Sequence, residues 1–337
     1  MIKDICIKNY KGFKDFEIKD FKQFNIITGK NNAGKSSLLE AISMLYNPLS
    51  AYYINWLTLN YSNTTYYSFF HNLETNIPIE ISTTSEKLKL LIDLQEKIEE
   101  EQRYIRDDKP ENLTKKQVGL RFNYSSKNIG KTDIFVGPEA RYRFKHKNED
   151  LHVSNTKLIN LRSMYLEDYV KFFDEIQTNK QDNIIINLLK ETIIPELKSI
   201  ALAQDNTLKV DVGYDKYLPF GALGDGIKTL FKILIAIYNN RDGILLVDEI
   251  ENGFHYSVLD SIWRVIIRAV QEFNVQIFIS THSKECITSY MKVFEEMNLK
   301  DDFDNYFRLE RAQTEITHVS YTSNELKAAL ENNFEIR

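Results

Sequence analysis

Apolar residues near the start of the chain recur at nearly alternate positions. Between residues 2 and 20 a turn near Lys11 divides them, and this spacing predicts two short strands. Residues 24–28 form a mostly apolar run that predicts a buried strand. Residues 37–45 show helical spacing instead and predict a helix that ends near Asn47.

Strands and helices alternate in the final third of the chain. The pattern predicts an apolar helix at 227–238 and a fully buried strand at 243–249. An amphipathic helix at 258–273 and a second buried strand at 276–282 follow. Such alternation is typical of a largely parallel sheet, whose functional site lies at the carboxyl ends of the strands.

The middle of the chain, residues 50–220, has a weaker pattern. We expect strands at 77–81, 117–124 and 133–136, and helical structure at 157–204. Residues 85–106 are interpreted as a charged helix, because Leu88, Leu91 and Leu94 lie three positions apart. The apolar repeat is too short for a long coiled coil.

A phosphate-binding pattern lies between the first buried strand and the first helix. Gly29 to Ser36 matches G-x-x-x-x-G-K-[ST], in which the glycines turn backbone N–H groups toward phosphate oxygens. Lys35 can reach the β- and γ-phosphates, and the Ser36 hydroxyl can ligate Mg²⁺. The sequence therefore predicts binding of ATP and Mg²⁺. The predicted nucleotide-binding residues are Gly29, Lys30, Asn31, Asn32, Ala33, Gly34, Lys35, Ser36 and Ser37.

Polar side chains end the two buried strands of the final third. Asp248 would hold Mg²⁺, and Glu249 would orient and polarise the attacking water. His282, at the end of the next strand, would contact the γ-phosphate. Lys35, Glu249 and His282 are thus the predicted catalytic residues.

A glycine-flanked aspartate opens the helix before the first of these strands. Gly224, Asp225 and Gly226 are interpreted as a signature segment that reaches the γ-phosphate on a second subunit, with a plain loop and Asp225 as helix cap as the alternative. Glu251 and His255, after the carboxylate pair, are accessory candidates for which functional and structural roles are equally supported.

Several further residues carry weaker signals. Arg141 follows a predicted strand and is a candidate for sensing nucleotide or coupling two lobes, although a surface arginine explains it equally well. Gln117 and Gln181 are alternative metal-contacting glutamines. Tyr10 and Phe13 could stack on adenine, but two core aromatics on a hairpin are the favoured interpretation.

Composition narrows the class of protein. The chain has 337 residues, 27% of them charged, and a net charge of −5, so it lacks the global basicity typical of nucleic-acid binding, while DNA stays open as a partner. The two cysteines, Cys6 and Cys286, favour buried thiols in a reducing cytoplasm. No apolar run reaches the roughly 20 residues that span a bilayer, so we expect no membrane association.

Taken together, the motifs resemble ABC-type ATPases of the RecF, SMC and OLD clade. The resemblance covers residues 1–48 and 215–337 well and the middle poorly. Residues 7–13 resemble the clade's opening hairpin, 246–255 its OLD-type Walker B and D-loop, and 280–283 its H-loop.

The resemblance implies an α/β fold, a P-loop NTPase with an ABC-type head. A mixed or parallel sheet core would carry an N-terminal antiparallel β lobe and a helical insertion. Residues 1–337 would form one ATPase domain, with the insertion at 50–220 and the signature, Walker B and H-loop at 215–337.

The resemblance also implies a homodimer or higher even oligomer, packed head to tail around two nucleotides. The sequence ends at Arg337 with no Toprim domain, so we expect an isolated ATPase module in the cytoplasm. By analogy it would switch or sense for a separately encoded effector, such as a Toprim-like nuclease, in bacterial defence against phage.

Two other functions remain open at this point. One is a RecF-like DNA-repair ATPase, and the other is a nucleotide-gated scaffold that sequesters a partner with incidental hydrolysis. A transporter ATPase is disfavoured, because the Ser-Gly-Gly of the transporter signature is absent from Gly224–Gly226.

Overall fold

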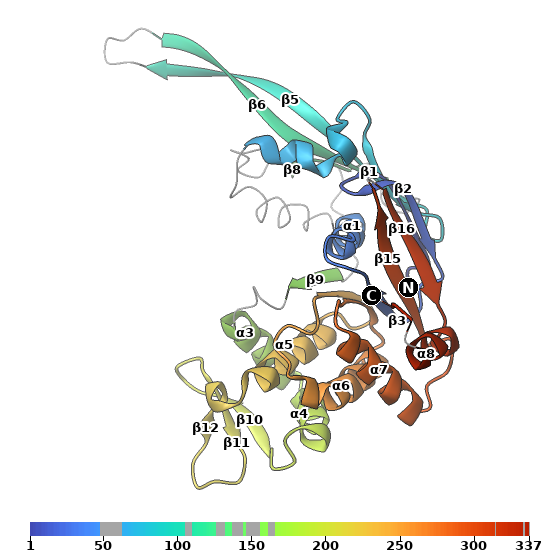
Figure 1. Ribbon diagram of the computed structural model, residues 1–337. Helices are drawn as coiled ribbons and strands as arrows, with labels where there is room; N and C mark the ends of the chain where they lie inside the picture. The colour runs from blue at the N-terminus through green and yellow to red at the C-terminus, as the bar shows by residue number, and fades with distance from the viewer. Residues whose placement is uncertain are drawn as a thin grey trace.

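Two large β-sheets, one small β-sheet and a layer of helices make up the described part of the molecule (Figure 1). The computed structural model describes residues 1–47, 63–104, 110–125, 132–136, 144–145, 156–160, 166–313, 315–332 and 334–336. Helix α1 (Lys35–Tyr46) lies between the seven-stranded and the six-stranded sheet, and the other α-helices lie on the far side of the six-stranded sheet.

The sheet that carries the phosphate-binding strand has six strands in the order β16-β15-β3-β14-β13-β9. Their bounds are β3 Phe24–Thr28, β9 Thr156–Asn160, β13 Ile244–Asp248, β14 Gln276–Ser280, β15 Asp304–Ala312 and β16 Glu315–Tyr321. Neighbouring strands are parallel except β16, which runs antiparallel to β15. The largely parallel sheet expected from the sequence is confirmed.

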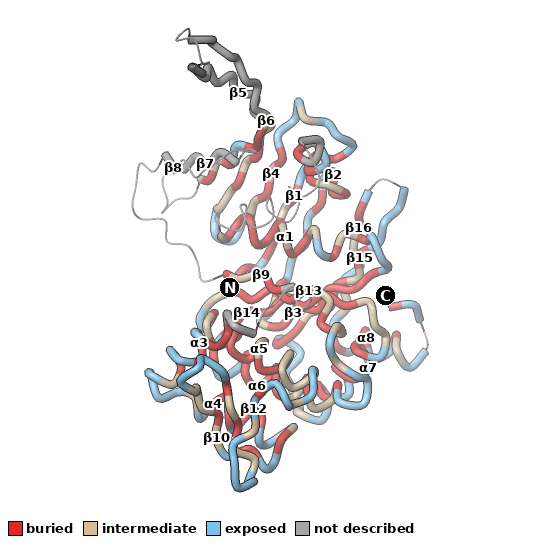
Figure 2. The backbone as a smooth tube through the Cα atoms, turned by 90° about the vertical axis from the view of Figure 1, so that its left-hand side faces the viewer, coloured by how far each residue is buried: buried red, intermediate tan, exposed pale blue. Residues whose placement is uncertain are grey.

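This sheet separates two hydrophobic cores, because alternate side chains of a strand point to opposite faces. In β13, Leu245 and Val247 pack into the core on the helical side, whereas Ile244 and Leu246 pack into the core beneath α1. All five residues of β13 are buried. Figure 2 shows the resulting red band of buried backbone across the middle of the molecule.

The helical side is formed by amphipathic helices and a small sheet. The helices are α3 Leu166–Thr178, α4 Asp182–Thr192, α5 Asp225–Asn239, α6 Leu259–Glu272, α7 Lys284–Glu296 and α8 Ser323–Glu331. The small antiparallel sheet contains β10 Ser199–Leu202, β11 Leu208–Asp211 and β12 Leu218–Pro219. The short 3₁₀ helices are η1 Asn63–Phe69, η2 His71–Leu73, η4 Phe220–Ala222 and η5 Tyr256–Val258.

Aromatic packing joins these helices to the sheet. The ring of Phe24, in β3, stacks on Tyr290 of α7 at a centroid distance of 5.2 Å. Trp263 of α6 donates its indole N–H to the carbonyl of Cys286 at 3.0 Å, which satisfies the polar group of a fully buried ring. Both cysteines are free thiols; Cys286 is buried, as the sequence predicted, whereas Cys6 is only half-buried.

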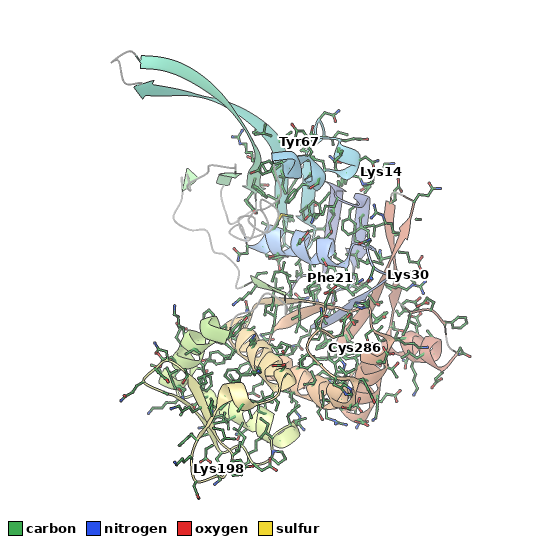
Figure 3. The ribbon with its side chains drawn as sticks, turned by 60° about the vertical axis from the view of Figure 1, so that its left-hand side comes forward. Lys14, Phe21, Lys30, Tyr67, Lys198 and Cys286 are labelled. Atoms are coloured by element: carbon green, nitrogen blue, oxygen red, sulfur yellow. The ribbon has the colours of Figure 1, made fainter. Side chains whose placement is uncertain are left out.

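The second sheet has seven antiparallel strands in the order β2-β1-β4-β5-β6-β7-β8. Their bounds are β1 Asp4–Tyr10, β2 Phe13–Lys19, β4 Ile79–Thr83, β5 Leu88–Tyr104, β6 Pro110–Ser125, β7 Thr132–Val136 and β8 Phe144–Lys145. Phe21, labelled in Figure 3, follows β2 and meets Phe278 and Phe307 of the first sheet edge-on, at centroid distances of 4.9 and 5.3 Å. The predicted N-terminal antiparallel lobe is thus present.

The prediction of a charged helix at 85–106 is wrong. Residues 88–104 form β5, a strand of 17 residues that pairs with β6 along its whole length. The two strands project from the molecule as a long ribbon (Figure 1). Leu88, Leu90, Ile92 and Leu94 alternate with polar positions except at residue 91, and this two-residue spacing prevailed over the three-residue spacing of leucines.

The helical prediction for 157–204 is correct only in part. Helices α3 and α4 lie inside this range, but its first residues belong to strand β9 and its last to strand β10. Thr156 to Asn160 pair in parallel with β13, so β9 is the edge strand of the site-bearing sheet. In the described parts of the chain, no helix combines the length and the apolar character needed to cross a membrane.

Candidate functional site

The phosphate-binding loop is a tight turn between β3 and α1. Gly29 and Gly34 have φ values of +145° and +96°, which side chains rarely tolerate. A Cβ on Gly29 would lie 2.5 Å from the carbonyl oxygen of Leu309, and one on Gly34 would overlap the side chain of Ile316. Both glycines of the pattern are therefore required by the backbone and its close neighbours.

Lys35 is held inside this loop. Its Nζ donates to the carbonyls of Gly29 and Lys30 at 2.8 and 3.0 Å. Burial lowers the pKa of Lys35, and three carboxylates oppose that shift, in the order Glu251, Asp248 and Glu249. The lysine thus lies between two backbone carbonyls with acidic groups near it, and it is the first residue of α1, whose N-cap is Gly34.

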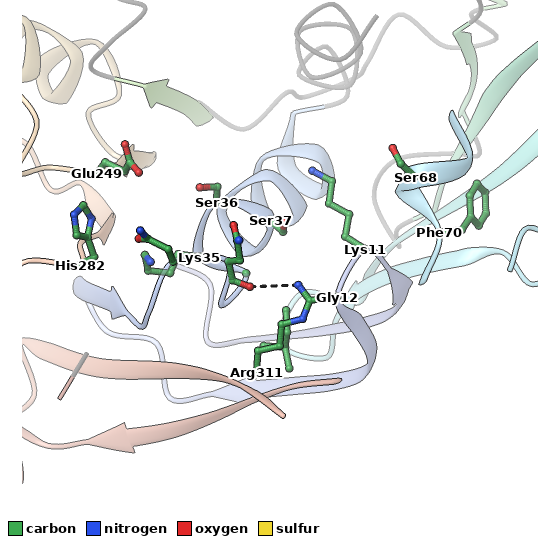
Figure 4. Close-up of a pocket in the computed structure, with 14 residues that line it drawn as sticks. Lys11, Gly12, Lys35, Ser36, Ser37, Ser68, Phe70, Glu249, His282 and Arg311 are labelled. Atoms are coloured by element: carbon green, nitrogen blue, oxygen red, sulfur yellow. Dashed lines mark hydrogen bonds between the residues drawn. The ribbon is translucent and has the colours of Figure 1, made fainter. Parts of the chain in front are cut away.

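An open cavity of about 850 Å³ runs along the loop. Figure 4 shows Glu249 and His282 at one end, Ser36 and Ser37 in the middle, and Ser68 at the other end. The residues that line the cavity are Lys11, Gly12, Asn31, Asn32, Gly34, Lys35, Ser36, Ser37, Ser68, Phe70, Glu249, His282, Arg311 and Ile316. The first helix, the carboxyl ends of two parallel strands and the second sheet thus all contribute to one site.

Asp248 ends β13 as a buried carboxylate. Ser280, at the end of the neighbouring strand β14, donates its hydroxyl to Asp248 Oδ1 at 2.5 Å. Burial raises the pKa of Asp248, and hydrogen bonds from Ser280 and Ser36 oppose the shift. Ser36 and Asp248, the predicted magnesium residues, therefore lie side by side.

Glu249 turns the chain away from the strand. Its φ of 52° is unusual for a residue other than glycine, and Ser280 Oγ accepts its backbone N–H at 2.8 Å. Asn252 donates to Glu249 Oε2 at 2.7 Å. The carboxylate is thus oriented by a side chain from its own turn while it lines the cavity.

His282 and Glu251 form a pair at the same end of the cavity. The backbone N–H of His282 donates to Glu251 Oε1 at 2.9 Å, and the ring Nδ1 lies 2.5 Å from the same oxygen. The side chain of His282 is 42% exposed, whereas that of Glu251 is 14% exposed. Glu251, an accessory candidate in the sequence, therefore lies directly behind the predicted γ-phosphate contact.

The segment Gly224–Gly226 lies elsewhere. Gly224 is the N-cap of α5, and among the described residues none of the three lines the cavity. The expectation that Asp225 caps the helix is wrong, because its exposed carboxylate pairs with Lys228 at 2.6 Å. A Cβ on Gly226 would lie 3.5 Å from the carbonyl oxygen of Gly253, so this helix start packs against the turn that carries Glu251.

The remaining predicted residues fall outside the cavity or outside the described chain. His255 caps η5 and lies 2.9 Å from the hydroxyl of Ser257, so its structural role is the one observed. Gln181 accepts from the hydroxyl of Tyr238 at 2.6 Å, and it does not line the cavity. Arg141 and the side chain of Gln117 lie outside the described residues.

Tyr10 and Phe13 are fully buried, as the favoured interpretation held. The Tyr10 hydroxyl donates to Glu40 of α1 at 2.9 Å, and Lys11 pairs with the same carboxylate. These contacts fasten the opening hairpin to the helix that follows the phosphate-binding loop.

Lys11, Ser68, Phe70 and Arg311 line the cavity without having been predicted from the sequence. Arg311 lies on β15, which pairs in parallel with the phosphate strand β3, and donates to the carbonyl of Asn32 at 3.4 Å. Arg311 could have been identified from the sequence if residues 304–312 had been recognised as a strand. Ser68 and Phe70 come from an irregular segment with no motif that marks them.

The residues present fit a phosphate chain and a magnesium ion. A hydroxyl and a carboxylate, Ser36 and Asp248, supply the oxygen ligands that Mg²⁺ prefers. Among the described residues no group of three His, Cys, Asp or Glu could hold a metal ion alone, and Mg²⁺ commonly uses one or two carboxylates together with phosphate oxygens. The start of α1, a helix of 12 residues, adds oriented N–H groups.

Comparisons with known proteins agree with this geometry. Residues 24–287 match a family described as "AAA domain, putative AbiEii toxin, Type IV TA system". The chain is 27% identical over 348 residues to an ATP/GTP phosphatase from Helicobacter pylori, covering 92% of this chain and 91% of that protein. An uncharacterized protein from Methanocaldococcus jannaschii is 50% identical over 44 residues, which are 13% of this chain and 20% of the relative.

Solved structures resemble the fold at low sequence identity. The SMC head domain from Thermotoga maritima is 13% identical, with a TM-score of 0.51 over 95% of this chain and 99% of that one. An SMC head bound to the C-winged helix domain of ScpA is also 13% identical, with a TM-score of 0.53 over 95% and 98%. At this identity the likeness concerns the fold alone.

Proposed function

The chain belongs to this family of AAA domains, and from that premise we propose that it works as a nucleotide-gated dimer that controls a separate effector protein. The fold class predicted from the sequence is confirmed by the likeness to SMC heads. The chain is an ABC-type ATPase, in agreement with its family and with its phosphatase relative. Its assignment to the OLD group stays a prediction.

One observation carries the proposed chemistry: groups suited to phosphate, metal and water meet in a single cavity. Lys35, Glu249 and His282 all line it, although Lys35 lies more than two hundred residues before the other two in the sequence. Lys35 would exchange its two carbonyl partners for phosphate oxygens, and Ser36 and Asp248 would hold Mg²⁺. When bound, Mg²⁺ supplies neutralisation of the charge that develops on the phosphates.

Glu249 is the residue proposed to prepare the attacking water. Its carboxylate is oriented by Asn252 and can accept a proton or polarise a water at the end of the cavity. His282, beside it, would contact the γ-phosphate and thereby distinguish the states before and after hydrolysis. Such a difference in contacts is what a ligand needs to shift a conformational equilibrium.

The dimer is proposed because the signature segment lies outside its own cavity. A Cβ on Gly224 would meet no heavy atom within 4 Å, and Gly224 caps the N-terminus of α5, where free N–H groups can bind an anion. In a head-to-tail pair this segment would complete the partner's site. Because Gly226 packs against Gly253, engagement of the segment would be transmitted to the turn that carries Glu251.

The effector is proposed by analogy. The family description names a toxin of a toxin–antitoxin system, and one SMC head of this fold was solved with a domain of ScpA bound to it. We propose a switch or sensor for such a separate protein in defence against phage, with a Toprim-like nuclease as one form of the effector.

Light scattering on the wild type and on Glu249→Gln tests the dimer. ATP should shift the mass to a dimer or higher even oligomer, and Glu249→Gln should hold that assembly longest because it hydrolyses slowly. GTP should be compared with ATP, since the relative is named for both nucleotides. A mass that does not respond to either nucleotide would refute nucleotide gating.

A further inference from the structure

Glu251 has no part in the proposed chemistry, yet it is placed behind one of the residues that does. It lies in the turn after β13, whereas His282 follows β14, so the two residues approach from neighbouring parallel strands. Their backbones are also joined there, because the N–H of Ile250 donates to the carbonyl of Ser280 at 3.1 Å. The carboxylate is therefore presented to His282 by a rigid sheet edge.

One oxygen of Glu251 serves both the backbone and the ring of His282. Oε1 accepts the backbone N–H at 2.9 Å, and it lies 2.5 Å from Nδ1. The approach to Nδ1 is close but not aligned as a hydrogen bond, so a small rotation of the ring would align it. An apo geometry that tightens with substrate is common among catalytic hydrogen bonds.

The two ring nitrogens of histidine lie on opposite sides of the imidazole, so a partner on one side determines what the other side presents. With Nδ1 directed at the carboxylate, Nε2 is left to face the cavity that His282 lines. Without Glu251, a side chain that is 42% exposed would be free to turn. Carboxylates commonly orient functional histidines in this way.

We propose that Glu251 is a positioning residue that holds Nδ1 of His282 so that Nε2 faces the γ-phosphate end of the cavity. The proposal rests on the proposed function, since it assigns Glu251 to the same site. Glu251 acts through His282 and touches neither nucleotide nor metal. Its second oxygen, Oε2, is buried and accepts no hydrogen bond from the described residues, and the carboxylate is the strongest of the negative charges acting on Lys35.

Steady-state kinetics on Glu251→Ala test the positioning role. We expect kcat to fall about 10- to 100-fold, the range for removal of a residue that orients a functional ligand. The affinity for nucleotide should change less than kcat does, because the phosphate contacts of the loop remain and only the charge of Glu251 near Lys35 is lost. Glu251→Gln keeps an oxygen for the backbone N–H of His282 and should fall between the wild type and Glu251→Ala. Glu272→Ala, an exposed glutamate of α6, is the matched control.

A double mutant separates the positioning role from a general effect on folding. If Glu251 acts through His282, Glu251→Ala should have no further effect in a His282→Ala background. Losses that multiply would overturn the proposal. If His282→Ala alone keeps the wild-type kcat, the proposed function loses its γ-phosphate contact and the positioning role falls with it.

A spectroscopic measurement reports on the ring without any hydrolysis. Long-range ¹H–¹⁵N spectra of the six histidines, with His282 assigned by His282→Ala, give the protonation of each ring nitrogen. Glu251→Ala should shift the ring nitrogens of His282 alone and leave the other five unchanged. Unchanged His282 signals would overturn the proposal even if kcat falls.

Discussion

The six-stranded sheet and the β5–β6 ribbon are both β-structure, but different forces determine them. The central strands β3, β13 and β14 are buried on both faces. Asp248, at the carboxyl end of β13, is held in place by Ser280 of the neighbouring strand β14. The ribbon pairs only with itself beyond residue 92 of β5 and before residue 120 of β6, so far as the described residues show. The proposed site therefore lies where the positions of the side chains are most constrained.

This contrast predicts that changes at the sheet edge act on chemistry and that changes along the ribbon do not. The largest effect is expected at Glu249. Glu249→Gln keeps the shape of the side chain but cannot accept a proton, so kcat should fall by about 10²- to 10⁴-fold, the usual contribution of a general base. Phosphate release under single-turnover conditions measures it. Full turnover would show that another group prepares the water.

The next largest effect is expected at Lys35. Lys35→Ala removes a charged donor whose hydrogen bonds contribute about 1.5–3 kcal/mol each, so the dissociation constant for ATP should rise about 10- to 100-fold. Calorimetric titration with a non-hydrolysable ATP analogue measures this affinity, and the exposed Lys3→Ala is the control for loss of a positive charge. An unchanged affinity would remove Lys35 from phosphate binding.

Gly34 tests how strictly the loop backbone is determined. Gly34→Ala places a Cβ at φ +96° against Ile316, and such strain and overpacking together cost about 1–3 kcal/mol of folding free energy. Urea denaturation measures the loss. Gly221→Ala, where no heavy atom lies within 4 Å of the new Cβ, should be nearly neutral. Equal effects at the two positions would contradict a constrained loop.

In contrast to Gly34→Ala, the variant Asp248→Asn is expected to be more stable than the wild type. Burial raises its pKa above the usual 3.8, so the folded state binds the proton more tightly than the unfolded state. The free energy of unfolding therefore falls as pH rises from the unfolded to the folded pKa, and the loss is fully present at neutral pH. Asp248→Asn avoids that loss while its amide oxygen can still accept from Ser280. It should melt higher than the wild type at pH 7 although it no longer supports hydrolysis.

Melting curves at several pH values test this sign. The difference between Asp248→Asn and the wild type should grow as pH rises through that window and then level off. The exposed Asp302→Asn should show no such growth. A variant that melts lower than the wild type at every pH would mean that the carboxylate stabilises the fold.

Most of the site could be predicted from the sequence because its geometry is local. The loop from Gly29 to Ser36 needs two glycines at a fixed spacing. Asp248 and Glu249 come at the end of one largely apolar segment, and His282 comes at the end of another. Glu251 and its contact with His282 could not be derived in the same way, because the contact depends on two strands lying side by side. Arg311 was missed for the same reason, since its strand had not been recognised.

The ribbon could not be predicted because its sequence fits two spacings at once. Leu88, Leu91 and Leu94 lie three apart, whereas Leu88, Leu90, Ile92 and Leu94 lie two apart. Glutamate and lysine are poor strand formers, so the charged residues after Leu94 favoured the helix. Pairing with β4 and β6 favours the strand over the helix, because it fully buries Leu90 and Ile92 in the sheet.

Shortening the ribbon should have the smallest effect on the site. Glu96 and Val118 are directly paired, so residues 97–117 can be replaced by Asn-Gly, which closes a two-residue hairpin between them. Leu94 and Val118, which pack against the second core, are kept, and among the described residues none from the ribbon lines the cavity. We expect nucleotide affinity within about twofold of the wild type and a free energy of unfolding changed by less than about 1 kcal/mol, as for surface changes that touch no core. A large loss of either would mean that the ribbon supports the site from outside it, and the contrast between the two regions would fail.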